Sequence, residues 1–238
     1  MSNAPYDFHV CVDGRDVGVT LRTHPRARTL RLRYDGTRDI LILTLPLRTS
    51  RRAAQKWAEQ QQLWIAAQLA KQAPLHRVGP GSRLPWGDTT MLVDWAEGRK
   101  RAVTHDGDRL CLGGPEVAVG ARVGRWLKAR ALVDFRARTE SVTQAAGLVC
   151  TDVGVGDPRA RWGSCNAAGR IRYSWRLIMA PEFVRHALVA HEVAHLAHMN
   201  HGPAFHALVE RLSAGDHARS QAWLKAHGRD LHRWRFGL

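Results

Sequence analysis

Residues 191–201 read HEVAHLAHMNH and place three histidines and one glutamate in a short segment. Histidines four positions apart on a helix, here His191 and His195, project from the same face about 6 Å apart along the axis, so both can reach one metal ion. Catalytic zinc takes three protein ligands and keeps a fourth position for water. Glu192 follows the first histidine directly, where a general base for that water belongs. The segment therefore predicts a zinc site for hydrolysis.

A third ligand has to come from downstream, and His201 is the favoured candidate. On a continuous helix its side chain would lie about 15 Å from His191 along the axis, too far to share a metal. Asn200 and Gly202 are residue types that tolerate the left-handed backbone at a helix end, and Pro203 prevents a simple continuation. The sequence thus ends the helix where a third histidine must turn back. Glu210 is the rival third ligand.

Other residues near the motif are candidates for supporting roles. His198 and His206 either support the metal and the substrate or are ordinary histidines on a helix surface. The oxyanion that forms during hydrolysis needs a hydrogen-bond donor, and Tyr173, Arg176 and His198 are the candidates. Cys165 has no base beside it in the sequence, so it is interpreted as a structural thiol rather than a redox or metal-binding group.

The pattern of apolar and polar residues predicts an α+β fold for the elements that position these residues. This pattern changes near residue 115. Residues 1–114 form a β-rich part with one long helix, and the predicted elements are a hairpin at Asp13-Gly14, strands at 29–34 and 40–47, a helix from Thr49 or Ser50 to about Gln72, a loop over 73–88, and two or three strands over 89–113. Residues 115–238 form a mostly helical part with a small sheet, and its predicted elements are a helix over 120–143, short strands over 150–175, a helix from Pro181 to about Met199, and two helices near 203–215 and 217–228.

Length and composition narrow the class of protein further. The 238 residues suffice for one large domain or two small ones. No run of about 18 apolar residues is present, which predicts no transmembrane helix, and the N-terminal residues lack the pattern of a secretory signal. The four cysteines lie far apart without a CxxC pair, which favours a reducing cytoplasm over a disulfide framework. Nothing in the sequence indicates an oligomeric state.

The net charge of +15 is spread almost evenly along the chain. Such a field attracts nucleic acid and other polyanions. The even spread argues against a dedicated patch, and a solvated arginine-rich surface is the simpler interpretation. Nucleic acid is therefore a candidate partner beside a protein or peptide substrate.

Motifs that occur in order along the chain carry a family resemblance. They read RTLRLRYDG, PLRTSRRAAQKWAEQQQLWI, RWGSCNAAGRIRYSWRLIMAP and HEVAHLAHMNHGPAFHALV. Over most of its length the chain resembles the YgjP-like branch of the SprT-type zinc metallopeptidases. The resemblance implies a zincin-like metallopeptidase domain over 115–238, with Zn²⁺ held by His191, His195 and His201 and with Glu192 as the catalytic glutamate.

Details of the last motif refine this resemblance. The HGPxF segment of SprT-like proteins matches at His201 to Phe205, which supports His201 over Glu210. The chain departs from many members of the branch at His206, where they carry tryptophan. The spacing of the three histidines also equals that of metzincins, but metzincins have glycine at the position of His198 and a Met-turn that is not recognisable here.

The WGSC segment precedes the metal motif and predicts a strand beside it. Residues 159–175 read as two strands, and a sheet edge near the metal of zincin-type proteases pairs with the extended substrate. We expect one of these strands to line the cleft on the side of His191.

The sequence thus predicts a cytoplasmic zinc-dependent peptidase in which Glu192 is the general base. One alternative is a nucleic-acid-binding protein with a structural zinc site, which would need a fourth protein ligand such as Cys165. Relatives with a SprT core include proteases that act on DNA-bound proteins, so the other alternative is a protease that DNA stimulates.

Overall fold

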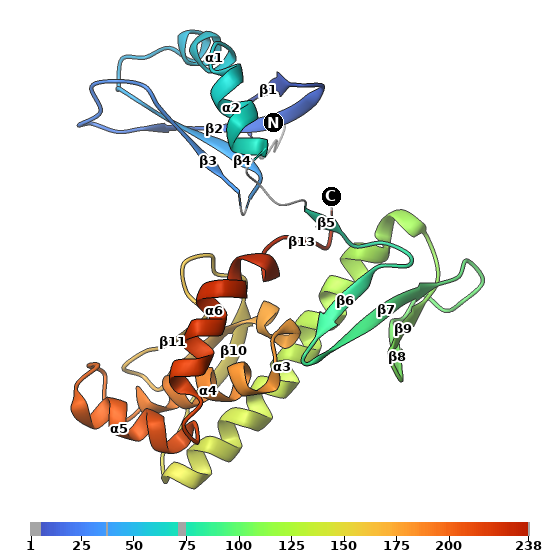
Figure 1. Cartoon of the computed structure of the whole chain (residues 1–238), viewed down its shortest axis with the longest axis vertical. Coiled ribbons are helices and arrows are strands. Elements are labelled where there is room, and N and C mark those ends of the chain that lie inside the picture. The colour runs from blue at the N-terminus through green and yellow to red at the C-terminus, as the bar shows by residue number, and fades with distance from the viewer. Residues whose placement is uncertain (1–5, 37, 71–74, 238) are drawn as a thin grey trace. The chain divides into compact units, whose positions relative to one another are not determined.

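The computed structural model describes residues 6–36, 38–70 and 75–237. It contains two compact units, Met1–Pro74 and Leu75–Leu238, each with its own hydrophobic core (Figure 1). Helices and small mixed sheets occur together, which confirms the predicted α+β class. The change of pattern predicted near residue 115 falls inside the second unit, and a domain boundary there stays a prediction. Among the described helices, none is long and apolar enough to cross a membrane.

The first unit is a four-stranded sheet with two helices against one face (Figure 1). The strands, in the order β1-β2-β4-β3, are β1 (Phe8–Val12), β2 (Arg15–Thr23), β4 (Ile40–Leu45) and β3 (Arg31–Asp35). The hairpin predicted between β1 and β2 is confirmed. Asp13 and Gly14 have φ angles of 51° and 75°, the left-handed backbone that a tight two-residue hairpin turn requires.

The single long helix predicted after the sheet is two helices, α1 (Arg51–Glu59) and α2 (Gln62–Ala70). Ser50 caps α1 as predicted, because its hydroxyl accepts a hydrogen bond from the Ala53 amide at 3.2 Å. The helix breaks because the amides of Gln60 and Gln61 bond to carbonyls three residues back rather than four. The predicted end near Gln72 lies outside the described residues.

The second unit is built around α3 (Val119–Ala146), a long helix that ends at Gly147 with a φ of 66° (Figure 1). One sheet has the order β6-β7-β9-β8 and consists of β6 (Arg83–Trp86), β7 (Thr89–Trp95), β9 (Arg109–Leu112) and β8 (Thr104–Asp106). The other has the order β10-β12-β11 and consists of β10 (Asp152–Gly156), β12 (Arg170–Ser174) and β11 (Gly163–Cys165).

The prediction of a loop over residues 73–88 is wrong for residues 75–88, the part that the structure describes. It contains β6 and also β5 (His76–Arg77), which pairs in parallel with β13 (Trp234–Arg235) near the other end of the unit. Val78 and Leu84 belong to the core of the unit, so this segment is held by packing that its Pro- and Gly-rich composition does not reveal.

The remaining elements of the second unit are helical. They are η1 (Glu116–Ala118), η2 (Trp175–Met179), α4 (Glu182–Ala194), α5 (Pro203–Leu212) and α6 (His217–Leu231). The predicted site helix is shorter than expected, since α4 ends at Ala194 rather than near Met199. The amides of Leu196 and Ala197 bond to carbonyls three residues back, which tightens the chain and ends the α-helix.

Candidate metal centre

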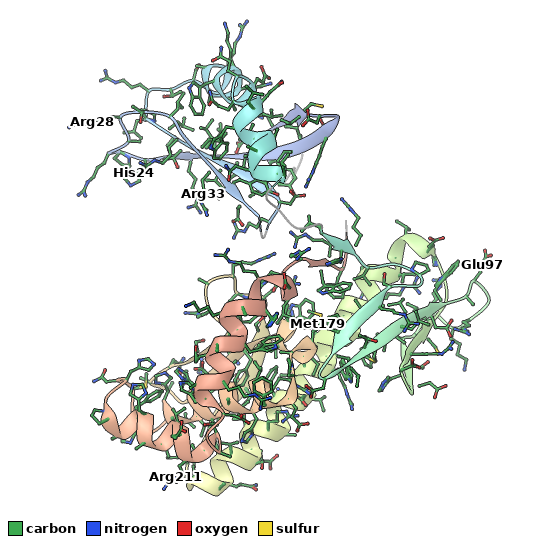
Figure 2. The ribbon with its side chains drawn as sticks, viewed as in Figure 1. His24, Arg28, Arg33, Glu97, Met179 and Arg211 are labelled. Atoms are coloured by element: carbon green, nitrogen blue, oxygen red, sulfur yellow. The ribbon has the colours of Figure 1, made fainter. Side chains whose placement is uncertain are left out.

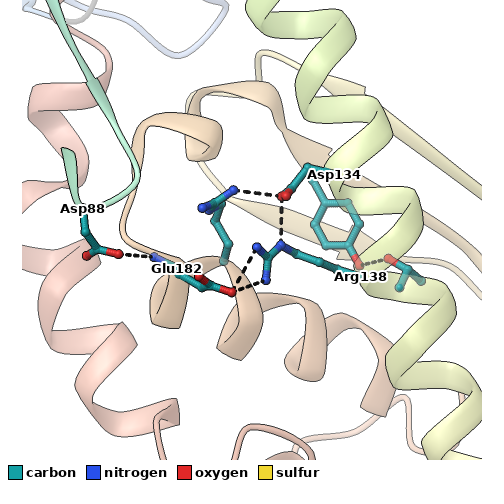
Figure 3. Close-up of polar contacts among 7 residues, drawn as sticks. Asp88, Asp134, Arg138 and Glu182 are labelled. Carbon is teal, nitrogen blue, oxygen red and sulfur yellow. Dashed lines mark hydrogen bonds and ion pairs between the residues drawn. The ribbon is translucent and has the colours of Figure 1, made fainter. Parts of the chain in front are cut away.

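Helix α4 is fixed at its start by a network of charged side chains (Figure 3). Asp134 on α3 accepts hydrogen bonds from Arg138 at 2.9 Å and from Arg185 of α4 at 3.1 Å. Arg138 also reaches Glu182 at 3.4 Å, and the Glu182 amide donates to Asp88 at 3.4 Å. These contacts tie the start of α4 to α3 and to the turn before β7.

Three histidines converge beyond that turn. Their candidate ligand nitrogens, from His191, His195 and His201, all lie within 4.8 Å of one another. His195 donates from Nδ1 to the main-chain oxygen of His198 at 3.2 Å, which leaves its Nε2 free for a metal. The Nε2 atoms of His191 and His201 lie 3.5 Å apart. Two nitrogens on one tetrahedral metal ion are about 3.4 Å apart, so this pair has the spacing that a shared metal requires.

The chain returns to the centre over residues 195–203. The helix stop predicted there is confirmed, because α5 begins at Pro203 with Gly202 as its N-cap. The left-handed backbone expected at this helix end is absent. Gly202 is extended, with φ −82° and ψ −179°, and Asn200 has no positive φ. Glu210, the rival third ligand, is not part of the histidine group within the described chain.

Phe205 is the ring on which all three histidines rest. It is fully buried, and its centroid lies 5.1 Å from that of His191 and 4.6 Å from those of His195 and His201. Such aromatic contacts favour particular ring orientations, so Phe205 holds the imidazoles in place. From the sequence alone, Phe205 could be identified only as part of the HGPxF motif, without its contacts to the histidines.

His217 is a neighbour of the metal centre that sequence reasoning missed. Its ring lies parallel to that of His191, with 5.4 Å between centroids and 16° between planes. It comes from the first turn of α6, and the only signal in the sequence is the abundance of histidine in this region. His206 lies farther out, with its centroid 6.4 Å from that of His201.

Glu192 is buried beside the histidines, on the inner side of α4. Its side chain belongs to a residue that is only 4% exposed, and burial raises its pKa to about 7, an effect that Arg161 opposes. A Cβ atom on Gly163 would lie 2.3 Å from its Oε1 atom, closer than two such atoms can approach. The glycine of WGSC therefore makes room for the Glu192 carboxyl group, and β11 lies on the site side of the sheet.

This contact predicts that Gly163→Ala impairs the site without unfolding the protein. Because the carboxyl group is the end of a flexible side chain, it should move aside, and a shift of about 1 Å in a catalytic group lowers kcat about 100-fold. The control is Gly156→Ala in the same sheet, where a new Cβ would meet only Pro158 at an ordinary 3.7 Å. Comparable kcat values for the two variants would refute the role given to Gly163.

Cys165 lies near this site without the character of a reactive thiol. Burial, with smaller effects from Glu192 and Cys150, raises its pKa to about 11, so the sulfur stays protonated at neutral pH. All four cysteines are free, and none joins the histidine group in the part of the chain that is described.

Two of the three oxyanion candidates are wrong. Tyr173 is fully buried, stacks on Phe135 with centroids 4.5 Å apart, and contacts the Thr139 hydroxyl at 3.0 Å. Arg176 is 5% exposed and makes two hydrogen bonds to Asp157, at 2.7 and 3.1 Å. Neither side chain can reach a substrate, because each is buried in the core. The sequence pattern did not predict this burial.

The WGSC segment is anchored to the end of α6. His232 stacks on Trp162 with centroids 5.0 Å apart, and Arg176 donates to the carbonyls of Leu231 and Trp234 at 2.8 and 3.1 Å. Burial, followed by the charges of Arg176 and Arg159, lowers the pKa of His232 to about 4.

This low pKa predicts acid sensitivity. Between pH 6.5 and about 4 the unfolded chain binds the proton that folded His232 refuses, so stability present above pH 6.5 is lost as the pH falls. We expect His232→Phe to reduce this loss by about 1–2 kcal/mol. Urea unfolding near pH 7 and near pH 4 measures this loss of stability. His227→Phe, on the exposed side of α6, is the control. An unchanged pH dependence in His232→Phe would contradict the prediction.

Comparison with known proteins adds one finding. A family model described as "YgjP-like, metallopeptidase domain" matches residues 28–227. The match includes the three histidines, Glu192 and Gly163. The chain matches no curated protein and no solved structure significantly.

Proposed function

Since the chain belongs to the YgjP-like metallopeptidase family, we propose that it is a zinc-dependent peptidase with His191, His195 and His201 as zinc ligands. The observation that carries this proposal is the convergence of three imidazoles beside a buried glutamate. Imidazole nitrogens suit zinc, and three ligands leave the open position that a catalytic site needs. Zinc in such a site lowers the pKa of a water molecule and polarises a carbonyl group.

Glu192 is the proposed general base. Its carboxylate accepts a proton from the attacking water and then delivers it to the nitrogen of the leaving amine. Burial of the carboxyl group raises its pKa, and the space left at Gly163 lets the group lie beside the histidines. His195 is held in one orientation by the His198 carbonyl, and Phe205 packs against all three imidazole rings.

Strand β11 is the proposed docking edge for the substrate backbone. It is the last strand of the sheet order β10-β12-β11, so its outer edge pairs with no described strand. Gly163, its first residue, touches Glu192. An extended peptide that adds to this edge would carry its scissile bond past the glutamate and the histidines.

A structural zinc site is the weaker alternative. Such sites close with four protein ligands, often cysteines, whereas the described part of the chain offers three histidines and no cysteine at the centre. A cytoplasmic setting is part of the proposal and is supported by the four free thiols.

The test combines metal content with proteolysis. Purified protein should hold about one zinc per chain and should cleave some members of a panel of unfolded proteins and peptides. A chelator should stop cleavage, and added zinc should restore it. Protein that holds no stoichiometric metal, or cleavage that survives complete removal of the metal, would refute the proposal.

A further inference from the structure

The first unit carries a concentrated group of arginines that the peptidase site does not use. Residues 17–34 contain five arginines, His24 and no acidic residue. We call these arginines the basic face, and its members are Arg22, Arg26, Arg28, Arg31 and Arg33. Counting charges over the two halves of the chain hides this group, because the less basic residues 75–114 dilute it within the first half.

The register of the sheet places three members of this group on one surface. Arg31 pairs with Thr44 of β4, and Thr44 pairs with Arg22 of β2, so all three point the same way. Arg22 and Arg31 are thus about 10 Å apart, and Arg33 lies about 7 Å along the strand from Arg31. The opposite surface of the sheet holds the buried leucines and valines that face α1 and α2.

The other two members lie in the loop between β2 and β3. Figure 2 shows His24 and Arg28 at this loop and Arg33 on the side of the sheet away from α1 and α2. Here a hollow of about 390 Å³ is lined by His24, Arg26, Arg28, Arg31, Thr29 and Thr44, with no acidic residue. Guanidinium groups and hydroxyls are the donors that bind phosphate oxygens.

The arginines of the basic face are not used in structural ion pairs. Elsewhere in the unit, Arg15 pairs with Asp39 at 2.5 Å and Arg38 with Asp35 at 4.0 Å. Within the described residues, no guanidinium group of the basic face makes a hydrogen bond or ion pair to another side chain. Three unneutralised charges on this surface and two in the adjoining loop repel one another, and a bound polyanion would relieve this repulsion.

Aromatic rings lie on the same side of the sheet. The Tyr6 ring covers Gly18, and its centroid is 5.4 Å from that of His9, which pairs with Gly18. Gly18 and Arg22 are four residues apart on β2. Because successive side chains point to opposite surfaces of a strand, these two residues lie on the same surface. Arginines beside aromatic rings on an open sheet are typical of surfaces that hold splayed single strands, whereas a duplex hides its bases from such rings.

We propose that the basic face and the Tyr6–His9 pair bind single-stranded nucleic acid. The arginines hold successive phosphates, and the two rings stack on bases. Binding itself does not depend on the proposed catalytic chemistry, so the two proposals can fail separately.

Fluorescence anisotropy of the full chain with a labelled oligonucleotide of about 20 thymidines or uridines tests the proposal. Arg28→Gln/Arg31→Gln/Arg33→Gln should raise Kd at least about 10-fold, and should lower the slope of log Kd against log salt by about 2, as expected for three lost phosphate contacts. Tyr6→Ala should raise Kd about 5-fold or more without a change in slope.

The matched control removes the same charge from the same unit. Arg48→Gln/Arg51→Gln/Arg52→Gln changes three exposed arginines around the start of α1, and it should raise Kd less than about 3-fold. Equal losses in the two triple variants would overturn the proposal, because they would indicate attraction to net charge alone. A duplex of the same length, or polyglutamate, that competes as well as the single strand would also overturn it.

Discussion

Glu192→Gln is expected to keep zinc and to lower kcat for peptide hydrolysis about 1,000-fold or more. The amide is nearly the same size as the carboxyl group, so the contact with Gly163 and the positions of the histidines should not change. It cannot accept a proton from water, and general-base catalysis contributes about 100- to 10,000-fold. Metal content and the melting temperature should match those of the wild-type protein.

The control for this prediction is Glu182→Gln. Glu182 lies at the start of the same helix, its side chain is 68% exposed, and its ion pair with Arg138 spans 3.4 Å. Surface pairs of this kind contribute at most about 1 kcal/mol to stability, so the variant should retain its kcat. If Glu192→Gln hydrolyses peptides as fast as the control, Glu192 is not the base.

His201→Ala is expected to release the zinc. Removal of one of three ligands leaves two imidazoles on the last turn of α4, and two nitrogens hold zinc far more weakly than three. The bound metal should fall from about one per chain to a small fraction after dialysis, and hydrolysis should stop. The melting temperature should fall to that of the metal-free wild type, because zinc that binds only the folded chain stabilises it.

Two further variants make this result specific. His206→Ala changes a neighbouring exposed histidine that lies outside the metal group, and it should keep the zinc. Glu210→Gln tests the rival third ligand and should also keep the zinc. Loss of metal from Glu210→Gln but not from His201→Ala would reverse the assignment.

The sequence predicted the grouping of the three histidines better than their surroundings. The spacing of His191 and His195 depends only on helix geometry, and the stop before Pro203 depends on a residue with no amide hydrogen, so both can be read locally. The contact between Gly163 and Glu192 joins a strand to a helix, and the parallel pairing of β5 with β13 joins segments near opposite ends of the unit. Such long-range contacts leave no periodic pattern in the sequence.

Burial of polar residues was the other source of error. Tyr173 and Arg176 carry groups that can stabilise an oxyanion, and residue type alone does not tell whether such a group faces a cleft or the core. The partners of Arg176 are Asp157 and two carbonyls near residue 233, none of which forms a motif with it. The break between α1 and α2 was missed because glutamine favours a helix as readily as the residues around it.

The hydrogen bonds from Arg176 to the carbonyls of Leu231 and Trp234 also bear on when the second unit can finish folding during synthesis. Translation is slow relative to the folding of small units, and nascent chains fold from the N-terminal side. Residues 1–74 contain all the strands and helices of their own unit and can fold while the ribosome is still translating. The packing around WGSC and Arg176 uses residues 231–234, so a nascent chain that ends after the histidines carries every proposed zinc ligand but not these contacts. We therefore expect the proposed peptidase site to become complete only after these residues have been added.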